Sequence, residues 1–144
     1  HFHSPSEHTV NGRHYPMEMH LVHVSEDQKL AVIGVLIEEG QHNQVFETIW
    51  SNLPQKTDQD VHIENVQVDI NDMLPRNQTT YRYSGSLTTP PCSEDVRWFV
   101  YAEPIELSRD QIKAFRNIFH GNNRPTQPLN DRALRYDSVG EIKK

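Results

Sequence analysis

Cysteine, positive charge and long apolar stretches are all scarce in this chain, and each shortage excludes something. Cys92 is the single cysteine, so no disulfide bond can close within these 144 residues. Acidic residues outnumber lysine and arginine by 20 to 14, and we expect no nucleic-acid partner because nucleic-acid-binding surfaces are usually basic. No apolar run approaches the roughly 20 residues that span a bilayer, so we also expect no membrane partner.

The residues alone leave two interpretations of Cys92 open. It is either a small buried apolar side chain or one half of a disulfide bond whose partner lies upstream of residue 1. The second interpretation would place the protein in an oxidising compartment. The chain begins at His1, so targeting information cannot be read from it.

Strand patterns dominate the sequence. Residues 17–25 alternate and are rich in β-forming side chains, and residues 29–40 form a continuous apolar run that ends at Gly40, as expected of a buried strand. Residues 79–107 predict strand, turn and strand, because Gly, Ser and paired prolines interrupt any helical pattern. From residue 122 onward we expect irregular structure.

Two segments have helical spacing. Apolar residues recur at helical intervals over 45–53 and stop before Pro54. The second helix is predicted to follow Ser108, a good N-cap residue with Gln111 three positions on, and to present an apolar stripe up to Phe119. With 35% hydrophobic residues, the sequence predicts one mainly β (α+β) domain with peripheral helices.

Histidines cluster near the start of the chain, either as surface residues or as a metal site. His1 and His3 are two positions apart, so in a strand both imidazoles lie on one face. Asn11–Gly12 is a turn signal, and the strand after it can return beside the first and bring His20 opposite the pair. Three neutral imidazoles from neighbouring strands suit a catalytic zinc ion, which keeps a fourth position for water.

Two carboxylates lie in the same segments. Glu18 shares the face of His20 two residues later and can accept the second ring N–H of a ligand histidine, unless it is a solvated strand residue. Glu7 is a metal ligand, a hydrogen-bond acceptor behind the ligands or an ordinary turn residue. These residues alone do not decide among the three roles.

Two families fit the opening motif. The pattern His1-x-His3-x3-Glu7 followed by Gly12 resembles the first motif of cupins, but the later Gly-rich and His–Asn motifs of a cupin are absent. Instead, the chain resembles an α-class carbonic anhydrase of bacterial type over essentially its whole length. The motifs that carry this resemblance, in the order and approximate spacing of that family, are "HFHSPSEHTVNG", "MEMHLVH", "LAVIGV", "YSGSLTTPPC", "VRW" and "NNRPTQPLN".

The resemblance implies a fold and an activity. The fold would be a large central twisted sheet, mostly antiparallel, with peripheral helices. The activity would be the zinc-dependent reversible hydration of carbon dioxide to bicarbonate and a proton. The chain matches only the C-terminal three-fifths of such an enzyme, so we expect residues 1–144 to be a partial domain whose N-terminal part is missing. The competing interpretation is a catalytically silent, carbonic-anhydrase-like binding domain.

The resemblance also implies residue roles. Thr88 matches the threonine whose hydroxyl accepts a hydrogen bond from the attacking oxygen and donates one to Glu7, which would make Glu7 an orienting acceptor and not a ligand. Glu18 matches the carboxylate behind the third ligand. The zinc ligands would be His1, His3 and His20.

Further residues match the substrate pocket of the family. Thr89 would line its bicarbonate side, and an apolar wall for carbon dioxide would come from Val22, Val32, Leu87 and Trp98, each of which could equally be a core residue. The proton shuttle of the family lies upstream, so no residue here is assigned to it. In bacterial members the cysteine that matches Cys92 pairs with one near the N-terminus, which implies a longer, periplasmic or secreted protein, and a homodimer would fit.

Overall fold

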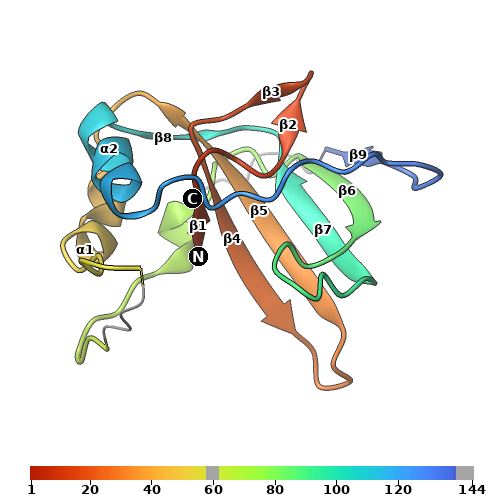
Figure 1. Ribbon diagram of the computed structural model, residues 1–144, viewed down its shortest axis with the longest axis horizontal. Helices are drawn as coiled ribbons and strands as arrows, with labels where there is room; N and C mark the ends of the chain where they lie inside the picture. Colours follow the sequence, from red (N-terminus) through yellow and green to blue (C-terminus); the bar gives the residue numbers. More distant parts are fainter. Residues whose placement is uncertain (58–61, 139–144) are drawn as a thin grey trace.

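The fold is built on one mixed, twisted sheet. A computed structural model describes residues 1–57 and 62–138 (Figure 1). Within them, seven strands form a sheet in the order β1-β4-β5-β7-β6-β9, with β8 paired to β5. Neighbouring strands are antiparallel except where β5 pairs with β7 and with β8. The strands are β1 (Phe2–His3), β4 (Met17–Val24), β5 (Leu30–Glu39), β6 (Thr80–Gly85), β7 (Val96–Tyr101), β8 (Ile105–Leu107) and β9 (Arg135–Asp137).

This sheet confirms the predicted mainly β, mostly antiparallel architecture. The strands expected over 17–25 and 29–40 are β4 and β5, and the strand–turn–strand region contains β6, β7 and β8. A separate hairpin joins β2 (Thr9–Val10) to β3 (Arg13–His14). The segment expected to be irregular contains β9, a strand too short to produce a readable alternation, which gains its order by pairing with β6.

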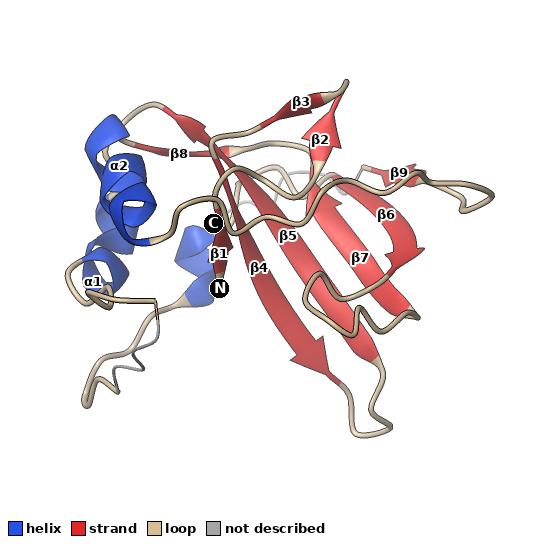
Figure 2. Ribbon diagram, viewed as in Figure 1, coloured by secondary structure: helices blue, strands red, loops and turns tan. Residues whose placement is uncertain are grey.

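The helices lie to one side of the sheet, as Figure 2 shows. They are η1 (Gln44–Phe46), α1 (Glu47–Trp50), η2 (Ile70–Met73) and α2 (Arg109–Ile118). The predicted Ser108 cap of α2 is present as a full capping box with Gln111. The helix expected over 45–53 is only one α-helical turn after a 3₁₀ turn. Before Pro54 the chain tightens, because the amides of Asn52 and Leu53 donate to carbonyls only three residues earlier.

The buried strand β4 has two faces of different chemistry. Met17 and Met19 enter a core that includes Phe46, Ile112 and Phe115 from the helices. On the opposite face, Glu18 and His20 are also buried, at 0% and 2% exposure. A second apolar cluster supports that face and contains Val32, Leu36, Val96, Trp98 and Val100. The sheet thus encloses polar side chains between packed strands and loops.

One feature of the helices bears on membranes. Over residues 1–57 and 62–138, no helix combines the length and the hydrophobicity that crossing a membrane demands.

Candidate metal centre

Strand pairing brings the three predicted ligand histidines together. The amino group of His1 donates to the carbonyl of His20 at 3.1 Å, and the amide of His20 donates to the carbonyl of His1 at 2.9 Å. In the same register His3 lies opposite Glu18. Because side chains two positions apart share a face, all four side chains project to one side of the sheet.

The reversal predicted at Asn11–Gly12 is the turn of the β2–β3 hairpin. Val10 pairs with Arg13, which leaves a two-residue loop, and both loop residues have positive φ values of 52° and 76°. Asn and Gly are favoured at such positions because they tolerate left-handed backbone conformations. The turn sends the chain back into β4 and so delivers His20 to the first two histidines.

The imidazoles are close enough to hold one ion. One ring nitrogen from each of His1, His3 and His20 lies within 4.8 Å of the others. His3 and His20 are 5% and 2% exposed, whereas His1 is exposed. Their ring centroids are 4.6 Å apart, and that of His1 lies 5.0 and 5.2 Å from theirs.

The ring of His3 is fixed with one nitrogen free. Its Nδ1 donates to the backbone carbonyl of Asn122 at 2.9 Å, because a carbonyl oxygen can only accept. Among the described residues its Nε2 is buried with no hydrogen-bond partner. Burial lowers the pKa of His3, against the opposing effect of the Asn122 hydrogen bond, and favours the neutral ring. A buried neutral nitrogen with a free lone pair is what a zinc ligand requires.

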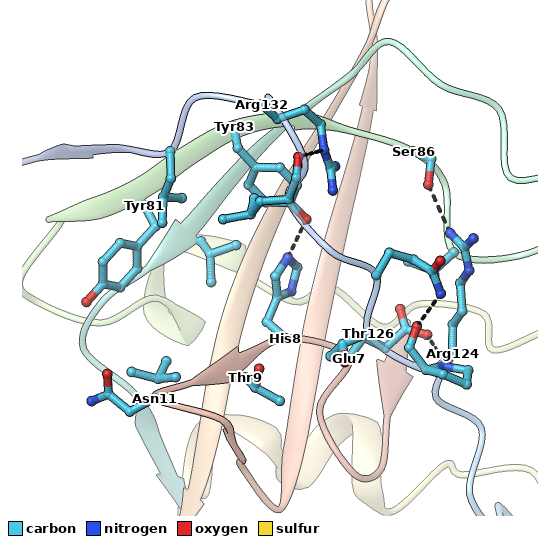
Figure 3. Close-up of a pocket in the computed structure, with 17 residues that line it drawn as sticks. Glu7, His8, Thr9, Asn11, Tyr81, Tyr83, Ser86, Arg124, Thr126 and Arg132 are labelled. Atoms are coloured by element: carbon cyan, nitrogen blue, oxygen red, sulfur yellow. Dashed lines mark hydrogen bonds between the residues drawn. The ribbon is translucent and has the colours of Figure 1, made fainter.

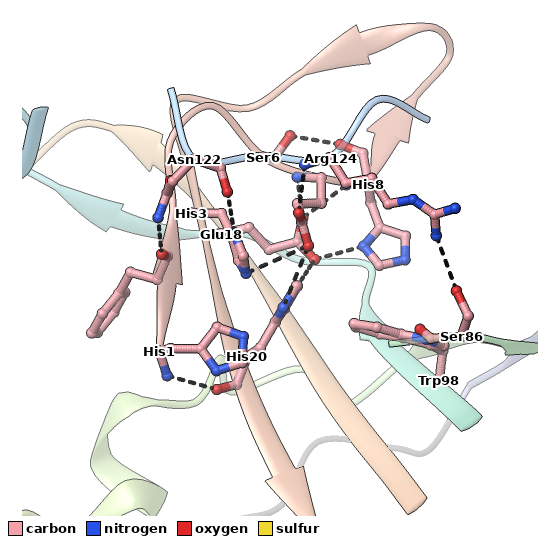
Figure 4. Close-up of polar contacts among 12 residues, drawn as sticks. His1, His3, Ser6, His8, Glu18, His20, Ser86, Trp98, Asn122 and Arg124 are labelled. Atoms are coloured by element: carbon pink, nitrogen blue, oxygen red, sulfur yellow. Dashed lines mark hydrogen bonds and ion pairs between the residues drawn. The ribbon is translucent and has the colours of Figure 1, made fainter. Parts of the chain in front are cut away.

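His20 is held in the complementary tautomer (Figure 4). Its Nε2 donates to Oε1 of Glu18 at 2.8 Å, which leaves Nδ1 free on the side of the other histidines. Glu18 also accepts from the ring of His8 at 2.6 Å and from the backbone amides of Glu7 and His8 at 2.9 and 2.8 Å. Burial alone would raise the pKa of Glu18, but the hydrogen bonds from His20 and His8 outweigh it and hold this pKa far below its usual value.

A hydrogen-bonded chain continues behind Glu18. Burial raises the pKa of Tyr83, so its hydroxyl stays protonated and can donate to Nε2 of His8 across 2.7 Å. His8, Glu18 and His20 also lie near enough to resemble a second metal-ligand group. Their facing atoms are already joined by hydrogen bonds, so this group orients His20 and is not a separate site.

Glu7 faces the cluster with one oxygen unpaired. Its Oε1 accepts from the backbone amide of Arg124 at 2.6 Å, and its Oε2 is buried without a partner among the described residues. Oε2 lies 3.4 Å from Nε2 of His3 and 3.8 Å from Nδ1 of His20. Thr88 is half-buried and lines the same cavity of about 390 Å³ as Glu7, although no hydrogen bond joins the two. Figure 3 shows Glu7 in this cavity.

Three of the predicted pocket residues form a row across the sheet. Val22 pairs with Val32, and Val32 pairs with Trp98. Val32 and Trp98 are buried at 1% and 2%, whereas Val22 is 45% exposed and presents an apolar surface. The Trp98 ring packs against His20 with centroids 4.8 Å apart. Leu87 packs against the same apolar cluster as Trp98.

Two further predicted residues lie on the loop between β6 and β7. Thr89 is exposed, and its carbonyl accepts from the amide of Cys92 at 2.9 Å in a tight turn. Cys92 is half-buried with an unbridged thiol and a φ of 56°. Neither of them contacts the histidine cluster through an interaction within the described residues.

Sequence reasoning missed two residues of the site. Gly34 lies opposite His20 in β5, and a Cβ there would be 3.0 Å from Oε1 of Glu18. A glycine inside a strand pattern signals a close approach and could have been used. Asn122 contacts His3 from 119 residues away in the chain, and its motif alone gives no signal of that contact.

Comparisons with known proteins agree on one family. The model of the eukaryotic-type carbonic anhydrase family matches residues 1–138. The chain is 49% identical over 134 residues to a carbonic anhydrase of Nostoc sp., with 93% of this chain and 51% of that protein covered. It is 47% identical over 135 residues to a carbonic anhydrase of Klebsiella pneumoniae, with 93% of this chain and 54% of that protein covered.

A solved structure gives the same result. The α-carbonic anhydrase of Thermovibrio ammonificans, in complex with the inhibitor sulfanilamide, matches with a TM-score of 0.89 and 50% identity, over 93% of this chain and 59% of that one. The chain spans about half the length of the two curated relatives described above.

Proposed function

Because the chain belongs to the eukaryotic-type, or α-class, carbonic anhydrase family, we propose that the whole protein catalyses the reversible hydration of carbon dioxide to bicarbonate and a proton. The observation that carries this proposal is the cluster of three imidazoles, in which the free nitrogens of the two buried rings are selected by hydrogen bonds on their opposite sides. Curated relatives named carbonic anhydrase support it.

The donor set suits zinc. Three imidazole nitrogens would hold the ion and leave room for one further ligand, as catalytic zinc sites require and structural ones do not. The buried Nε2 of His3 has no hydrogen-bond partner among the described residues, and a bound ion would supply one. When bound by His1, His3 and His20, zinc would supply Lewis-acid activation of water, for which carbonic anhydrase is the standard example.

The protein's own residues would orient the reactants. Glu18 holds His20 in the tautomer that turns Nδ1 to the cluster. The unpaired Oε2 of Glu7 is available to accept a hydrogen bond from the hydroxyl of Thr88, whose oxygen could then accept a hydrogen bond from the attacking oxygen. That arrangement would direct a lone pair of the attacking oxygen at carbon dioxide.

The apolar side of the site would receive the substrate. Carbon dioxide carries no charge and suits the surface that Val22 presents beside Val32, Trp98 and Leu87. Thr89 would contact the bicarbonate product. Because the relative from Thermovibrio ammonificans binds sulfanilamide, we propose that the same compound is a probe of this pocket.

Two other functions were compatible with the sequence. The interpretation as a cupin-type metal protein is wrong, because the family and the fold are those of carbonic anhydrases. No observation favours a silent binding domain, since each of the three ligand positions and both relay positions carries the side chain that the chemistry needs.

The test of the proposal is zinc analysis together with carbon dioxide hydration, using the longest natural form of the protein. We expect about one zinc per domain, and His20→Ala should abolish both zinc binding and turnover. His42→Ala is the matched control, because His42 is exposed and pairs with Glu47 at 3.0 Å, away from the cluster. Tetrahedral zinc that survives His20→Ala would overturn the ligand assignment.

We further propose an exported, longer protein in which Cys92 forms a disulfide bond with an upstream cysteine, in the periplasm or outside the cell. The support is the family resemblance and the half-buried, unbridged thiol. A homodimer is proposed on the same resemblance and is tested by sedimentation of the full-length protein.

A further inference from the structure

Asn122 contacts the backbone on both sides of His3. Its Nδ2 donates to the carbonyl of Phe2 at 2.9 Å, and its Oδ1 accepts from the amide of Ser4 at 2.9 Å. Its own backbone carbonyl accepts from Nδ1 of His3, also at 2.9 Å. One residue from the segment after α2 therefore makes three hydrogen bonds around a single candidate ligand histidine. Figure 4 shows the one to the ring of His3.

The side-chain amide of Asn122 pairs with the free edge of β1, where a neighbouring strand would otherwise bind. His1 and His3 direct their backbone groups toward β4, because His1 and His20 exchange two hydrogen bonds. In an antiparallel pair the backbone groups of the intervening residues point the other way, which exposes the carbonyl of Phe2 and the amide of Ser4 at the open edge of β1. The donor and acceptor of Asn122 satisfy both groups at this edge.

This clamp matters because β1 is only two residues long. Such a short strand is weakly ordered by its own pairing, yet a metal ligand must be held closely in position. We propose that the side chain of Asn122 is a positioning residue for the metal site, which fixes the backbone of His3 while its carbonyl fixes the ring. The inference rests on the proposed zinc function.

The alternative is that Asn122 only stabilises the fold. Asn43 provides a matched control for that case. Its side chain also makes two hydrogen bonds to backbone groups, donating to the carbonyl of Glu106 at 3.1 Å and accepting from the amide of Val45 at 3.2 Å. No interaction within the described residues joins Asn43 to the histidine cluster.

The experiment compares zinc affinity in Asn122→Ala, Asn122→Asp and Asn43→Ala, made in the full-length protein and measured by competition with a chromophoric chelator. Loss of an outer contact to a ligand typically weakens metal binding by about 10- to 100-fold, so we expect that range for Asn122→Ala. Asn122→Asp keeps the acceptor for Ser4 but places a carboxylate oxygen, which cannot donate, against the carbonyl of Phe2, so we expect a loss in the same range. Asn43→Ala should lower the melting temperature while zinc affinity stays within about threefold.

A metal-free measurement separates this inference from the proposed function. Long-range ¹H–¹⁵N spectra of the apoprotein should show His3 protonated at Nδ1, and Asn122→Ala should give a mixture of tautomers. If Asn122→Ala does not fold, the His3 tautomers are measured in Asn122→Asp instead. A parent that binds no zinc would refute the proposed function, whereas unchanged tautomers and affinity in both Asn122 variants, or equal losses in Asn43→Ala, would refute the clamp.

Discussion

At the scale of single residues, Gly34 makes room for Glu18 behind the histidine cluster by lacking a side chain. Glu18 occupies the space above it and accepts four hydrogen bonds, so this carboxylate cannot move aside easily. A Cβ at position 34 would lie 3.0 Å from Oε1 of Glu18 and 3.3 Å from Cγ2 of Val100. The orientation of His20 thus depends on the smallest residue of the neighbouring strand.

We therefore expect Gly34→Ala to destabilise the protein by about 1–3 kcal/mol through overpacking, and to weaken zinc binding by displacing Glu18. Chemical denaturation and chelator competition measure the two effects. Gly40→Ala is the control for zinc affinity, since its Cβ would displace the exposed side chain of Glu106. This side chain accepts from the amide of Gln41 and makes no contact with Glu18, so stability should fall while zinc affinity is kept. Unchanged zinc affinity in Gly34→Ala would show that Glu18 does not need its present position.

The proposed relay gives a second prediction at this scale. Thr88→Ala should leave zinc bound and reduce hydration by roughly 10²-fold, because the attacking oxygen would lose its orienting acceptor. Glu7→Gln should reproduce part of that loss. Stopped-flow hydration assays and zinc analysis of the same samples test both variants, and full turnover in the two would remove the relay from the mechanism.

At the scale of elements, α2 connects the helical side of the fold to the metal site. The helix starts at a capping box formed by Ser108 and Gln111 and ends at Ile118, four residues before Asn122. Arg116, on its last turn, donates to the hydroxyl of Ser4 at 2.8 Å and to the carbonyl of Pro16 at 3.0 Å. The segment after α2 then crosses in front of the sheet toward β9 (Figure 1).

Removal of the cap should therefore affect stability more than chemistry. Ser108→Ala should cost about 1 kcal/mol of unfolding free energy, because the amide of Gln111 loses its acceptor. Ser108→Asp should restore most of it, since Asp also caps helices well. Thermal unfolding measures the loss, and hydration at a temperature well below unfolding should stay within about twofold if the helix acts only as a support.

At the scale of the whole molecule, the site is asymmetric. His3 and His20 are buried and each is held by an outer hydrogen bond, whereas the exposed ring of His1 makes no hydrogen bond within the described part of the chain. Two of the three proposed ligands are thus fixed by these residues and the third is not. The chain spans about half the length of its curated relatives, and we propose that further residues hold His1.

This asymmetry predicts that residues 1–144 expressed alone bind zinc about 10- to 100-fold more weakly than the longer protein, because one ligand lacks an outer partner. Their hydration rate should fall accordingly. Thiol titration of both forms tests the proposed disulfide: Cys92 should react in the isolated chain and not in the native longer protein. An isolated chain with parental affinity and rate would contradict the prediction.

The sequence by itself determined the local elements and which histidines cluster as candidate ligands. The β4 and β5 strands, the Asn11–Gly12 reversal and the Ser108 cap follow from short-range preferences, because backbone sterics and local hydrogen bonds act within a few residues. The spacing of His1 and His3, with His20 after one turn, was sufficient to predict a metal cluster since strand periodicity fixes the faces of side chains.

Tertiary structure alone decided how the ring of His3 is held and what makes room for Glu18. The contact of His3 with Asn122 spans 119 positions, and the space for Glu18 comes from Gly34 on an adjacent strand. Such contacts depend on sheet register and on the path of the chain after α2, to which no local preference corresponds. The type of the candidate ligands was therefore readable from the sequence, whereas the orientation of His3 required the fold, because hydrogen bonds between distant segments set it.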